Sequence, residues 1–328
     1  MESAAKTEGT EKVGWEQKSQ AMDFPGTAIC IPTKNAGRQF GHLLTALQRQ
    51  TLRFDHLLII DSGSTDGTAE LARQSGASVH VIPATAFNHG ATRNLALQLV
   101  NADIYIFLTQ DVIPVNDHTL ENLIRPFREF PEVGLAYGRQ LPRRGAGPIE
   151  VFGRFFSYPP DSQLKKKADA PRLGIKTVFC SNACAAYRQQ TLAAVGAFPH
   201  HVISTEDTYL AAKMLEAGYA IYYAADALVY HSHDYSVIQE FKRYFDLGVF
   251  YESREHWIGD SFGRTQRQGW RFFVEGLNYL YHQGCYRSIP EWFIRTLSKF
   301  LAYKLGATER RLPNALKYRL SMHKNFWI

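Results

Sequence analysis

The sequence predicts an α/β protein with a mostly parallel sheet, helices on both faces of that sheet, and a helical C-terminal region. In the first half of the chain, short apolar runs alternate with segments of helical periodicity, and polar residues follow each run. The last third carries apolar residues at helical spacing. Of the 328 residues, 45% are hydrophobic and 21% are charged, which excludes a wholly disordered, collagen-like or disulfide-framework protein.

The first half of the chain predicts four strands joined by three helices. The apolar runs lie at 27–32, 56–60, 78–82 and 104–108. Helices are expected at 38–50, from a cap at Thr65 or Asp66 to Gln74, and at 91–100. Strands separated by helices in this way form right-handed βαβ units.

The pattern becomes less regular beyond Gly134. The stretch from Arg143 to Arg172 is rich in glycine, proline and lysine, so we expect part of it to be a mobile loop. We expect regular structure at 178–187, helices at 189–195 and 207–217, and strands at 219–223 and 227–230. The chain is therefore divided into a flexible leader (1–24), a sheet domain (25–235) and a helical, basic C-terminal region (236–328).

Neither a secretory signal nor a membrane span is predicted. Residues 1–23 lack an apolar core, and the longest apolar stretch, 219–230, has twelve residues and contains Asp226. The four cysteines lack the spacing of a disulfide scaffold or a zinc site, so we expect buried, reduced thiols. These features predict a cytoplasmic protein.

The C-terminal region is both basic and amphipathic. From Arg295 onward, eight Lys and Arg residues face one acid, Glu309. This excess favours a phosphate-rich partner, either nucleic acid or an anionic membrane surface; the alternative is a solvated face. The apolar positions are expected to pack on the sheet domain, on a second subunit or on a membrane: Trp270, Phe273, Val274, Leu277, Leu280 and Tyr281, then Trp292, Phe293, Leu297, Phe300 and Leu301.

Polar residues that follow the predicted strands form the candidate site, because ligands of open parallel sheets bind at the carboxyl ends of the strands. The glycine motifs of dinucleotide-binding folds and P-loops are absent, which excludes those two classes. Acidic groups here suit hydrogen bonds to a base or ribose and a carboxylate–metal bridge to a diphosphate. The candidate residues are Pro32, Thr33, Asn35, Asp61, Ser62, Arg93, Thr109, Gln110 and Asp111.

The order of these segments resembles the family 2 glycosyltransferases, whose nucleotide-sugar-binding fold is called GT-A. The matching segments span roughly residues 27–235 and read IPTKN, IIDSGSTDGT, NHGATRN, FLTQD, SNACAAYRQQTLAAVGAF, TEDTYLAAKMLEAGY and YHSH. More narrowly, FNHGATRN followed by FLTQD is similar to bacterial rhamnosyltransferases that use dTDP-L-rhamnose. The resemblance implies a GT-A fold and an enzyme.

The resemblance implies a nucleotide site at the first strand ends. Thr33 and Asn35 would line it, and Asp61 would accept a hydrogen bond from the pyrimidine N3–H. The structural alternative for Asp61 is a turn-forming role in the D-S-G-S segment. Arg93 would reach the nucleotide or its phosphate, and its alternative is an ion pair on a helix surface.

A metal site is implied at Asp111. Thr109-Gln110-Asp111 occupies the family's D-x-D position with Thr in place of the first acid, a departure that agrees with the rhamnosyltransferase subset. Asp111 would hold Mg²⁺ or Mn²⁺, which would neutralise charge on the leaving diphosphate. His231 and His233 are the candidates to complete the site, since they would share one face of a continuing strand.

The resemblance implies that Asp207 is the catalytic base, with Glu206 beside it. Inversion at an anomeric carbon needs a carboxylate opposite the leaving group to take the proton of the acceptor hydroxyl. A like-charged neighbour and partial burial would raise the pKa of that carboxylate. The structural alternative is a pair of acids at the start of a helix capped by Thr205 or Ser204.

Together these features predict an inverting transferase that moves L-rhamnose from dTDP-L-rhamnose to a glycan or lipid-linked glycan in cell-surface polysaccharide synthesis. The alternatives are a family 2 enzyme that uses a UDP-hexose and a non-catalytic nucleotide-sugar or glycan-binding module. The Thr in the D-x-D position motivates the second alternative, and the intact Glu206-Asp207 pair argues against it. We expect no nucleic-acid partner, since no recognised motif is present, and we expect peripheral contact with the inner face of the cell membrane or a homo-oligomer through the C-terminal helices.

Overall fold

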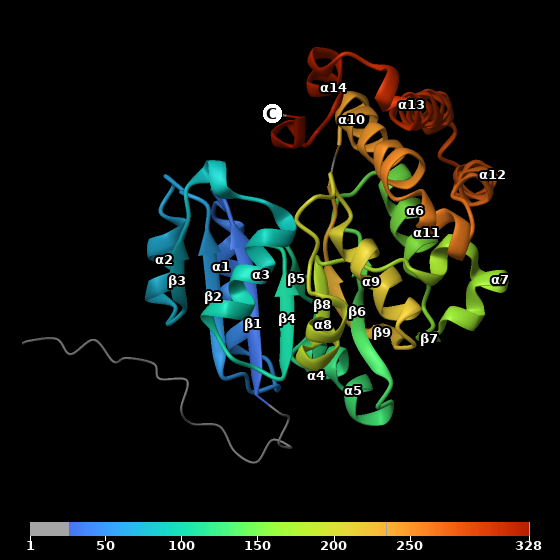
Figure 1. Cartoon of the computed structure of the whole chain (residues 1–328). Helices are drawn as coiled ribbons and strands as arrows, with labels where there is room; N and C mark the ends of the chain where they lie inside the picture. Colours follow the sequence, from blue (N-terminus) through green and yellow to red (C-terminus); the bar gives the residue numbers. More distant parts are fainter. Residues whose placement is uncertain (1–25, 234, 328) are drawn as a thin grey trace, which may run out of the picture.

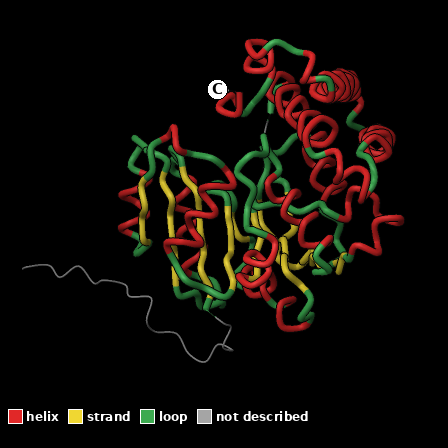
Figure 2. Tube along the Cα trace, in the orientation of Figure 1, coloured by secondary structure: helices red, strands yellow, loops and turns green. Residues whose placement is uncertain are grey.

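The computed structural model describes residues 26–233 and 235–327, which form a mixed nine-stranded sheet with helices on both faces (Figure 1, Figure 2). The order along the sheet is β3-β2-β1-β4-β8-β6-β9-β5, and β7 pairs with β9. The predicted α/β class is confirmed. The strands are β1 (Thr27–Thr33), β2 (His56–Asp61), β3 (Ser78–Val81), β4 (Ile104–Leu108), β5 (Ile113–Pro114), β6 (Val133–Leu141), β7 (Gln163–Lys165), β8 (Cys184–Arg188) and β9 (Ala220–Tyr230).

The first half of the sheet follows the prediction. Strands β1 to β4 pair in parallel, and three helices connect them: α1 (Gln39–Gln48), α2 (Thr68–Gln74) and α3 (His89–Leu99). Helix α3 begins two residues before the expected start, because the side-chain oxygen of Asn88 accepts from the backbone N–H of Gly90 and Ala91 at 3.0 and 2.9 Å. The N-cap of α2 is Gly67, with φ of 85°, and not Thr65 or Asp66 as expected; Asp66 precedes it and accepts from the N–H of Thr68 at 3.1 Å.

The second half of the sheet is mixed. Strand β8 runs antiparallel to both β4 and β6, while β6 and β9 are parallel. Strand β6 was not predicted from the sequence, because its partner strands are distant in sequence and its glycines weaken the strand pattern. A Cβ on Gly138 would lie 2.6 Å from the carbonyl oxygen of Ala227, so glycine lets β6 approach β9 closely. The two strands predicted at 219–230 are one strand, β9.

The stretch 143–172, part of which was expected to be a mobile loop, is mostly regular structure. This stretch contains α6 (Pro148–Ser157), β7 and α7 (Ala170–Leu173). Pro148 occupies the first turn of α6, where a missing N–H costs no hydrogen bond. Phe152 anchors the helix by packing in a small apolar cluster with Leu280 and Trp292. Distant C-terminal residues therefore order a segment whose local composition predicts a loop.

Two apolar clusters cover the opposite faces of the sheet. Along β1, Ala28 and Cys30 belong to one cluster, and Ile29 and Ile31 belong to the other. This alternation is the period-two pattern of a strand buried on both faces. The sheet is therefore the core of the molecule, and its carboxyl-end loops project from that core (Figure 1).

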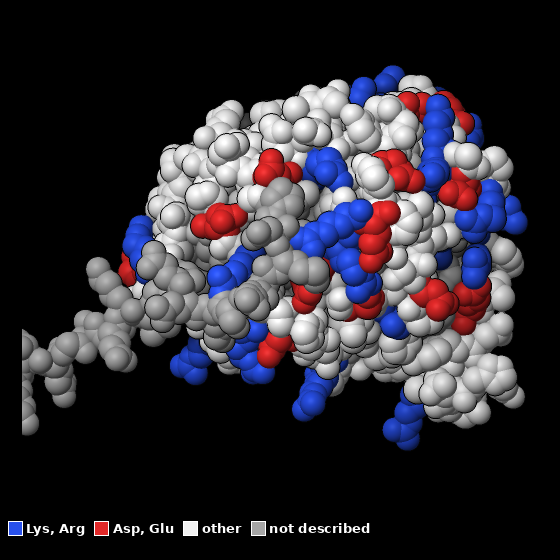
Figure 3. Space-filling model, turned by 90° about the horizontal axis from the view of Figure 1, so that it is seen from below, with Lys and Arg blue, Asp and Glu red and all other residues white. Residues whose placement is uncertain are grey.

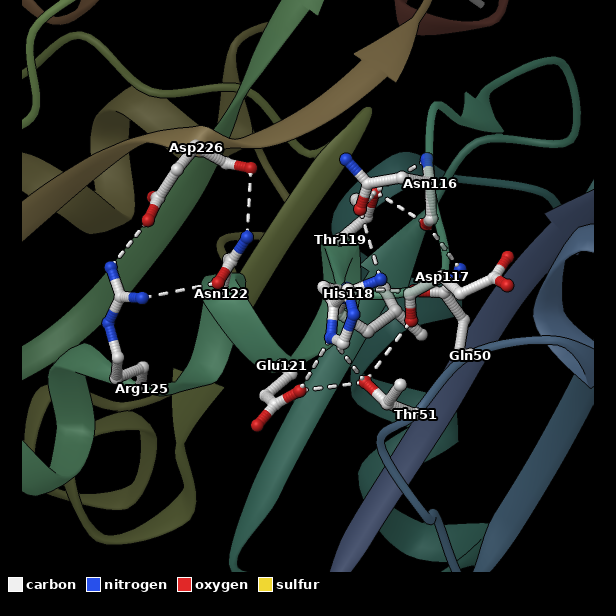
Figure 4. Close-up of polar contacts among 11 residues, drawn as sticks. Gln50, Thr51, Asn116, Asp117, His118, Thr119, Glu121, Asn122, Arg125 and Asp226 are labelled. Atoms are coloured by element: carbon white, nitrogen blue, oxygen red, sulfur yellow. Dashed lines mark hydrogen bonds and ion pairs between the residues drawn. The ribbon is translucent and has the colours of Figure 1, made fainter.

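Polar contacts tie the end of α1 to α4 (Thr119–Ile124), which is followed by α5 (Pro126–Glu129) (Figure 4). The side chain of Gln50 accepts from the N–H of Leu120 at 2.9 Å, and Thr51 donates to Glu121 at 2.7 Å. Arg125 lies 2.5 Å from the carboxylate of Asp226 on β9. These contacts join the parallel half of the sheet to β9.

The remaining helices include a C-terminal group that packs beside the sheet (Figure 1). Helices α10 and α13 touch closely at Gly248 and Gly306, where an added Cβ would collide with backbone atoms of the other helix. Arg295 and Lys299 of α13 both lie 2.9 Å from Glu240 of α10. The helices are α8 (Gln189–Val195), α9 (Glu206–Glu216), α10 (Val237–Gly248), α11 (His256–Phe262), α12 (Gln266–His282), α13 (Ile289–Ala307) and α14 (Asn314–Leu320).

The apolar positions of α12 and α13 divide between two environments. Leu280 and Trp292 are fully buried. Outward-facing positions of α13 are apolar over two turns, with 47–60% of each side chain exposed: Phe293, Ile294, Leu297, Phe300 and Leu301. We call these five residues the α13 apolar face. Among residues 26–233 and 235–327, no helix has the length and apolar character needed to span a bilayer.

The surface of the molecule carries charges of both signs. On the face viewed in Figure 3, Lys and Arg side chains are interspersed with Asp and Glu. In the C-terminal region, Arg295 and Lys299 are paired with Glu240, and Lys317 lies 2.9 Å from Glu309. Part of the predicted basic excess is therefore neutralised within the fold.

Candidate functional site

Hydrogen bonds join the loop after β1 to the loop after β2. The carboxylate of Asp61 accepts from the hydroxyl of Thr33 at 2.9 Å and from the N–H and hydroxyl of Ser64 at 2.8 and 2.5 Å. The side-chain oxygen of Asn35, a residue with φ of 45°, accepts from the N–H of Thr65 at 2.9 Å. Asp61 is buried, and these contacts fit its turn-forming alternative.

Gln110 links the end of β4 to this network. Its side-chain oxygen accepts from the N–H of Lys34 at 2.7 Å, and its amide nitrogen donates to the Lys34 carbonyl at 3.2 Å. Ser62 donates through its hydroxyl to the Thr33 carbonyl at 2.8 Å. Pro32, the residue before Thr33, pairs with Ile60 in the β1–β2 register. The structure therefore brings the predicted residues of the first, second and fourth strand ends together.

Arg93 lies inside the fold, where it pairs with Glu206 at 2.8 Å. Its guanidinium packs between the rings of Phe107 and Phe198, at 5.8 and 5.9 Å from their centroids, and donates to the carbonyl of His89 at 2.9 Å. Arg93 is neither in the β1–β2 loops nor on a helix surface. Its position links α3 to the acid pair at the start of α9.

Glu206 and Asp207 begin α9 and are held by Asn182, which precedes β8. The Asn182 amide donates to Glu206 at 3.0 Å, and its backbone N–H donates to Asp207 at 3.1 Å. Tyr187 donates to the Asn182 side-chain oxygen at 2.6 Å and fixes that amide. Asp207 also accepts from the N–H of Thr208 at 2.7 Å.

The two acids have opposite pKa shifts. Burial alone would raise the pKa of Glu206, but the charge of Arg93 and the hydrogen bond from Asn182 hold that pKa below its usual range. Burial and the negative charge of Glu206 raise the pKa of Asp207. Glu206 is thus kept ionised by a partner, whereas Asp207 is suited to accept a proton.

The turn before this acid pair is strained. Thr205 has φ of 57°, a left-handed conformation that costs a non-glycine residue about 1–3 kcal/mol. Neither of the expected caps, Thr205 or Ser204, caps α9 with its side chain. Instead, both hydroxyls are buried without a hydrogen-bond partner among the described residues. Strain and unpaired polar atoms next to paired carboxylates are typical of a functional site.

Asp111, His231 and His233 form a second cluster. Their potential ligand atoms all lie within 4.8 Å of one another. Strand pairing explains the proximity, since Ile113 of β5 pairs with Tyr230, the last residue of β9. The Asp111 carboxylate lies 3.4 Å from Nε2 of His231 and 3.7 Å from Nδ1 of His233.

The hydrogen bonds around His231 fix its tautomer. The side-chain oxygen of Gln140 is 2.8 Å from Nδ1 of His231 and accepts from Arg154 at 2.5 Å. Because arginine can only donate, the Gln140 atom facing both groups is the oxygen, and Nδ1 of His231 must carry the proton. The unprotonated Nε2 is buried without a hydrogen-bond partner and faces the Asp111 carboxylate. Two electron-rich atoms that face each other in a buried site suit a cation between them.

The protonation states of the cluster also suit a cation. Burial lowers the pKa of His231, and burial together with the neighbouring His231 lowers the pKa of His233 to about 4. Two neutral imidazoles and one carboxylate are the forms that ligate a metal. The residues present therefore fit a divalent cation.

Several residues of the site were not predicted from the sequence. Gln140 and Arg154 orient His231, Asn182 bridges the acid pair, and Arg143 lies 3.7 Å from the Asp111 carboxylate. Gln140, Arg143 and Arg154 come from the irregular stretch beyond Gly134, whereas Asn182 lies just before β8, within 178–187, where regular structure was expected. The signal available was SNACAAY, which contains Asn182 but gives no indication of its partners.

The glycosyl transferase family 2 model matches residues 28–196. The O-antigen chain rhamnosyltransferase RfbN of Salmonella typhimurium is 42% identical over 301 residues, covering 91% of this chain and 95% of the relative. The O-antigen chain rhamnosyltransferase WbaN of Salmonella anatum is 41% identical over 306 residues, covering 93% and 96%. This chain thus aligns with both relatives over almost their full length.

Solved structures share the fold at low sequence identity. The mannosyltransferase PcManGT from Pyrobaculum calidifontis, solved in complex with GDP-Man and Mn²⁺, has a TM-score of 0.59 and 14% identity, covering 92% of each chain. S. aureus TarS 1-349 has a TM-score of 0.51 and 16% identity, covering 87% of this chain and 91% of the solved one. The similarity extends through the C-terminal helices as well as the sheet.

Proposed function

The chain belongs to the family 2 glycosyltransferases, and from this premise we propose that it moves an L-rhamnosyl group from dTDP-L-rhamnose to a hydroxyl of a glycan or lipid-linked glycan. The observation that carries the proposal is the identity of 42% and 41%, across nine-tenths of the chain, to two O-antigen chain rhamnosyltransferases. The product would be a cell-surface polysaccharide or its precursor.

The acid pair supplies the proton chemistry of this reaction. Asp207 takes the proton of the acceptor hydroxyl while the acceptor oxygen forms a bond to the anomeric carbon. The bond from that carbon to the phosphate oxygen breaks, and its electron pair leaves with dTDP. Attack opposite the leaving group inverts the anomeric carbon. Glu206, paired with Arg93, stays ionised and raises the pKa of Asp207 towards a useful value.

Asp111, His231 and His233 would hold a divalent cation that offsets the charge of the departing diphosphate. Mg²⁺ prefers oxygen ligands and retained waters, so a site with two imidazoles favours Mn²⁺. Gln140 keeps Nε2 of His231 unprotonated and directed at the site. Arg143, near Asp111, is placed to contact a phosphate oxygen.

The strand-end network would bind the nucleotide. We propose that Thr33, Asn35 and Asp61 line the base and ribose, with Pro32, Ser62, Thr109 and Gln110 shaping the same loops. Asp61 would have to exchange part of its present hydrogen bonding for the pyrimidine N3–H. Thymine and uracil share that donor, so this contact alone does not separate dTDP from UDP.

The C-terminal helices would place the enzyme on the inner face of the cell membrane. The α13 apolar face is joined to α12 through ring contacts from Phe293 to Phe273 and from Phe273 to Trp270, at 5.4 and 5.6 Å. Lys304 lies at one end of this face, 5.8 Å from the Phe300 ring. Aromatic and aliphatic residues bordered by a cation suit the interface of an anionic bilayer. A second copy of the chain is the competing occupant.

Liposome sedimentation separates these two occupants. We expect binding to anionic vesicles that weakens as salt rises, because charge attraction is screened over about 8 Å at physiological ionic strength. Leu297→Glu should reduce this binding without loss of the fold. Equal sedimentation with neutral and anionic vesicles, or a salt-independent dimer abolished by Leu297→Glu, would contradict the membrane assignment.

A thermal-shift screen of nucleotide sugars, with and without Mn²⁺, tests the donor assignment. A ligand at 100 times its Kd stabilises the folded state by about 2.7 kcal/mol. We expect the largest Mn²⁺-dependent rise in Tm with dTDP-L-rhamnose, and consumption of that donor in a competition assay. A larger shift and faster consumption with a UDP-hexose would favour the alternative family 2 donor.

A further inference from the structure

We propose that the C-terminal segment contributes to the catalytic site, where His323, together with His89 and Arg243, binds a phosphate group of a substrate. The proposal deepens the proposed function and rests on it for the identity of the substrate. The three residues come from the segment after α14, the first turn of α3, and α10. We call them the His89–Arg243–His323 group.

A continuous chain of contacts joins His323 to the acid pair. The ring of His323 meets the ring of His89 edge-on, with centroids 5.4 Å apart. Arg93 donates to the carbonyl of His89 at 2.9 Å and pairs with Glu206 at 2.8 Å. Figure 1 shows the C-terminus above the carboxyl-end loops of the sheet. His323 therefore lies at the catalytic end of the molecule, although it is 116 residues from Asp207 in sequence.

Buried contacts hold this segment in place. The Asp246 carboxylate on α10 accepts from the N–H groups of Met322 and His323 at 2.9 and 3.2 Å. Asp246 is 1% exposed, so both hydrogen bonds are shielded from water. Phe326 and Trp327 pack against the larger apolar cluster of the sheet. The position of His323 is thus set by a buried acid on one side and by aromatic packing on the other.

Arg243 supplies the fixed positive charge of the group. It precedes Asp246 by almost one turn of α10 and is exposed. Burial is the main cause of the lowered pKa values of His89, His233 and His323, and the positive charge of Arg243 lowers them further. Residues three apart share one face of a helix, so Arg243 lies on the face of α10 that holds the His323 segment through Asp246, and it is exposed to solvent.

This combination of side chains suits a phosphate. A guanidinium binds phosphate oxygens bidentately, and neutral imidazoles can donate hydrogen bonds to them. Burial lowers the pKa of His89, and lowers that of His323 to about 4, so both rings are neutral in the free protein. Phosphate could come from the diphosphate of the donor or from a lipid-linked acceptor. Either source would present phosphate oxygens to the same three side chains.

Calorimetry with dTDP and Mn²⁺, and with geranyl diphosphate added to the dTDP–Mn²⁺ complex, tests the group. Arg243→Ala should weaken one of these two ligands by at least tenfold, and His323→Ala should weaken the same ligand by about three- to tenfold. Thymidine binding should stay unchanged. His323→Gln, which keeps a donor, should restore part of the affinity. The matched control is Lys324→Ala, since Lys324 is exposed and contacts the ring of Tyr318.

The two ligands distinguish the phosphate sources. Loss of dTDP affinity assigns the group to the donor, and selective loss of geranyl diphosphate affinity assigns it to the acceptor. Unchanged affinity for both ligands in Arg243→Ala and His323→Ala, with melting curves like that of the wild type, would overturn the proposal. Weakened geranyl diphosphate binding in an enzyme that binds dTDP but does not consume dTDP-L-rhamnose would retain the phosphate-binding role of the His89–Arg243–His323 group and reject the proposed donor.

Discussion

The loops after β1 and β2 and the two carboxylate clusters, at Asp207 and Asp111, differ in how their polar atoms are satisfied. Asp61 accepts three hydrogen bonds from within its own loops. In contrast, Nε2 of His231 and the hydroxyls of Ser204 and Thr205 are buried without a partner among the described residues. A satisfied network gives a rigid binding surface, whereas unpaired groups and shifted pKa values indicate where cations, protons or substrate hydroxyls act.

The largest expected effect is at the acid pair. Asp207→Asn keeps the size of the side chain but cannot accept a proton, so kcat should fall by about 10²–10⁴, the range for loss of a general base. Donor binding, measured by calorimetry, should be nearly unchanged. The exposed Asp161→Asn is the control. Near-normal turnover in Asp207→Asn would assign the base to Glu206 or another group.

The next effect in size concerns the metal cluster. Asp111→Asn removes the only carboxylate of the cluster, so we expect loss of transfer and of Mn²⁺-dependent dTDP binding with the fold retained. Titration calorimetry with Mn²⁺ and dTDP measures this directly. Unchanged Mn²⁺-dependent affinity in the variant would remove Asp111 from the metal site.

A smaller effect is expected at Gln140, which contacts the candidate metal ligand His231. Gln140→Leu frees His231 from its fixed tautomer, and loss of such a supporting contact weakens metal affinity about 10–100-fold. The nitrogen chemical shifts of His231 should show the Nδ1–H tautomer in the wild type and a mixture in Gln140→Leu. Gln190→Leu, at an exposed position, is the control. Wild-type metal affinity and an unchanged tautomer in Gln140→Leu would contradict the role of Gln140.

The pH dependence of kcat tests the difference between Glu206 and Asp207. The pKa of Asp207 is raised to about 6 by burial and by Glu206, and the base works only when deprotonated. We therefore expect kcat to fall about tenfold per pH unit below about 6. Glu206→Gln removes the neighbouring negative charge, so the falling limb should move to lower pH. An unmoved or upward-shifted limb would contradict the coupling between the two acids.

The smallest effect is expected in the loops after β1 and β2, where the Asp61 carboxylate already accepts three hydrogen bonds. Asp61→Asn keeps the shape of the side chain and loses its charge, so the donor KM should rise several-fold while kcat changes little. Steady-state kinetics at varied donor concentration separates the two constants. A large fall in kcat with unchanged KM would mean that the β1–β2 loops take part in the chemical step.

The parallel half of the fold was predictable because its information is local. The runs at 27–32 and 104–108 carry strand-forming residues, and the apolar spacing within 38–50 predicts α1. Strand β6 and helix α6 were not predictable, because residues distant in sequence bury them: Ala227 approaches Gly138, and Trp292 covers Phe152. Local sequence cannot express such contacts.

The same distinction applies to the site. The family resemblance, together with positions after predicted strands, pointed to Asp111, His231 and His233, and the β5–β9 pairing brings them together. Gln140, Asn182 and His323 were not identified, because the contacts that distinguish each of them are with residues far away in sequence. Arg93 was expected to contact the nucleotide or its phosphate because a guanidinium suits phosphate. In the fold it forms an ion pair with Glu206 instead.

The anomeric configuration of the rhamnose released by slow hydrolysis of dTDP-β-L-rhamnose tests the central claim most directly. Water here replaces the acceptor hydroxyl, and proton NMR at early times distinguishes the anomers before they equilibrate. A single displacement assisted by Asp207 predicts that α-L-rhamnose appears first. Initial release of β-L-rhamnose would show retention and contradict the mechanism.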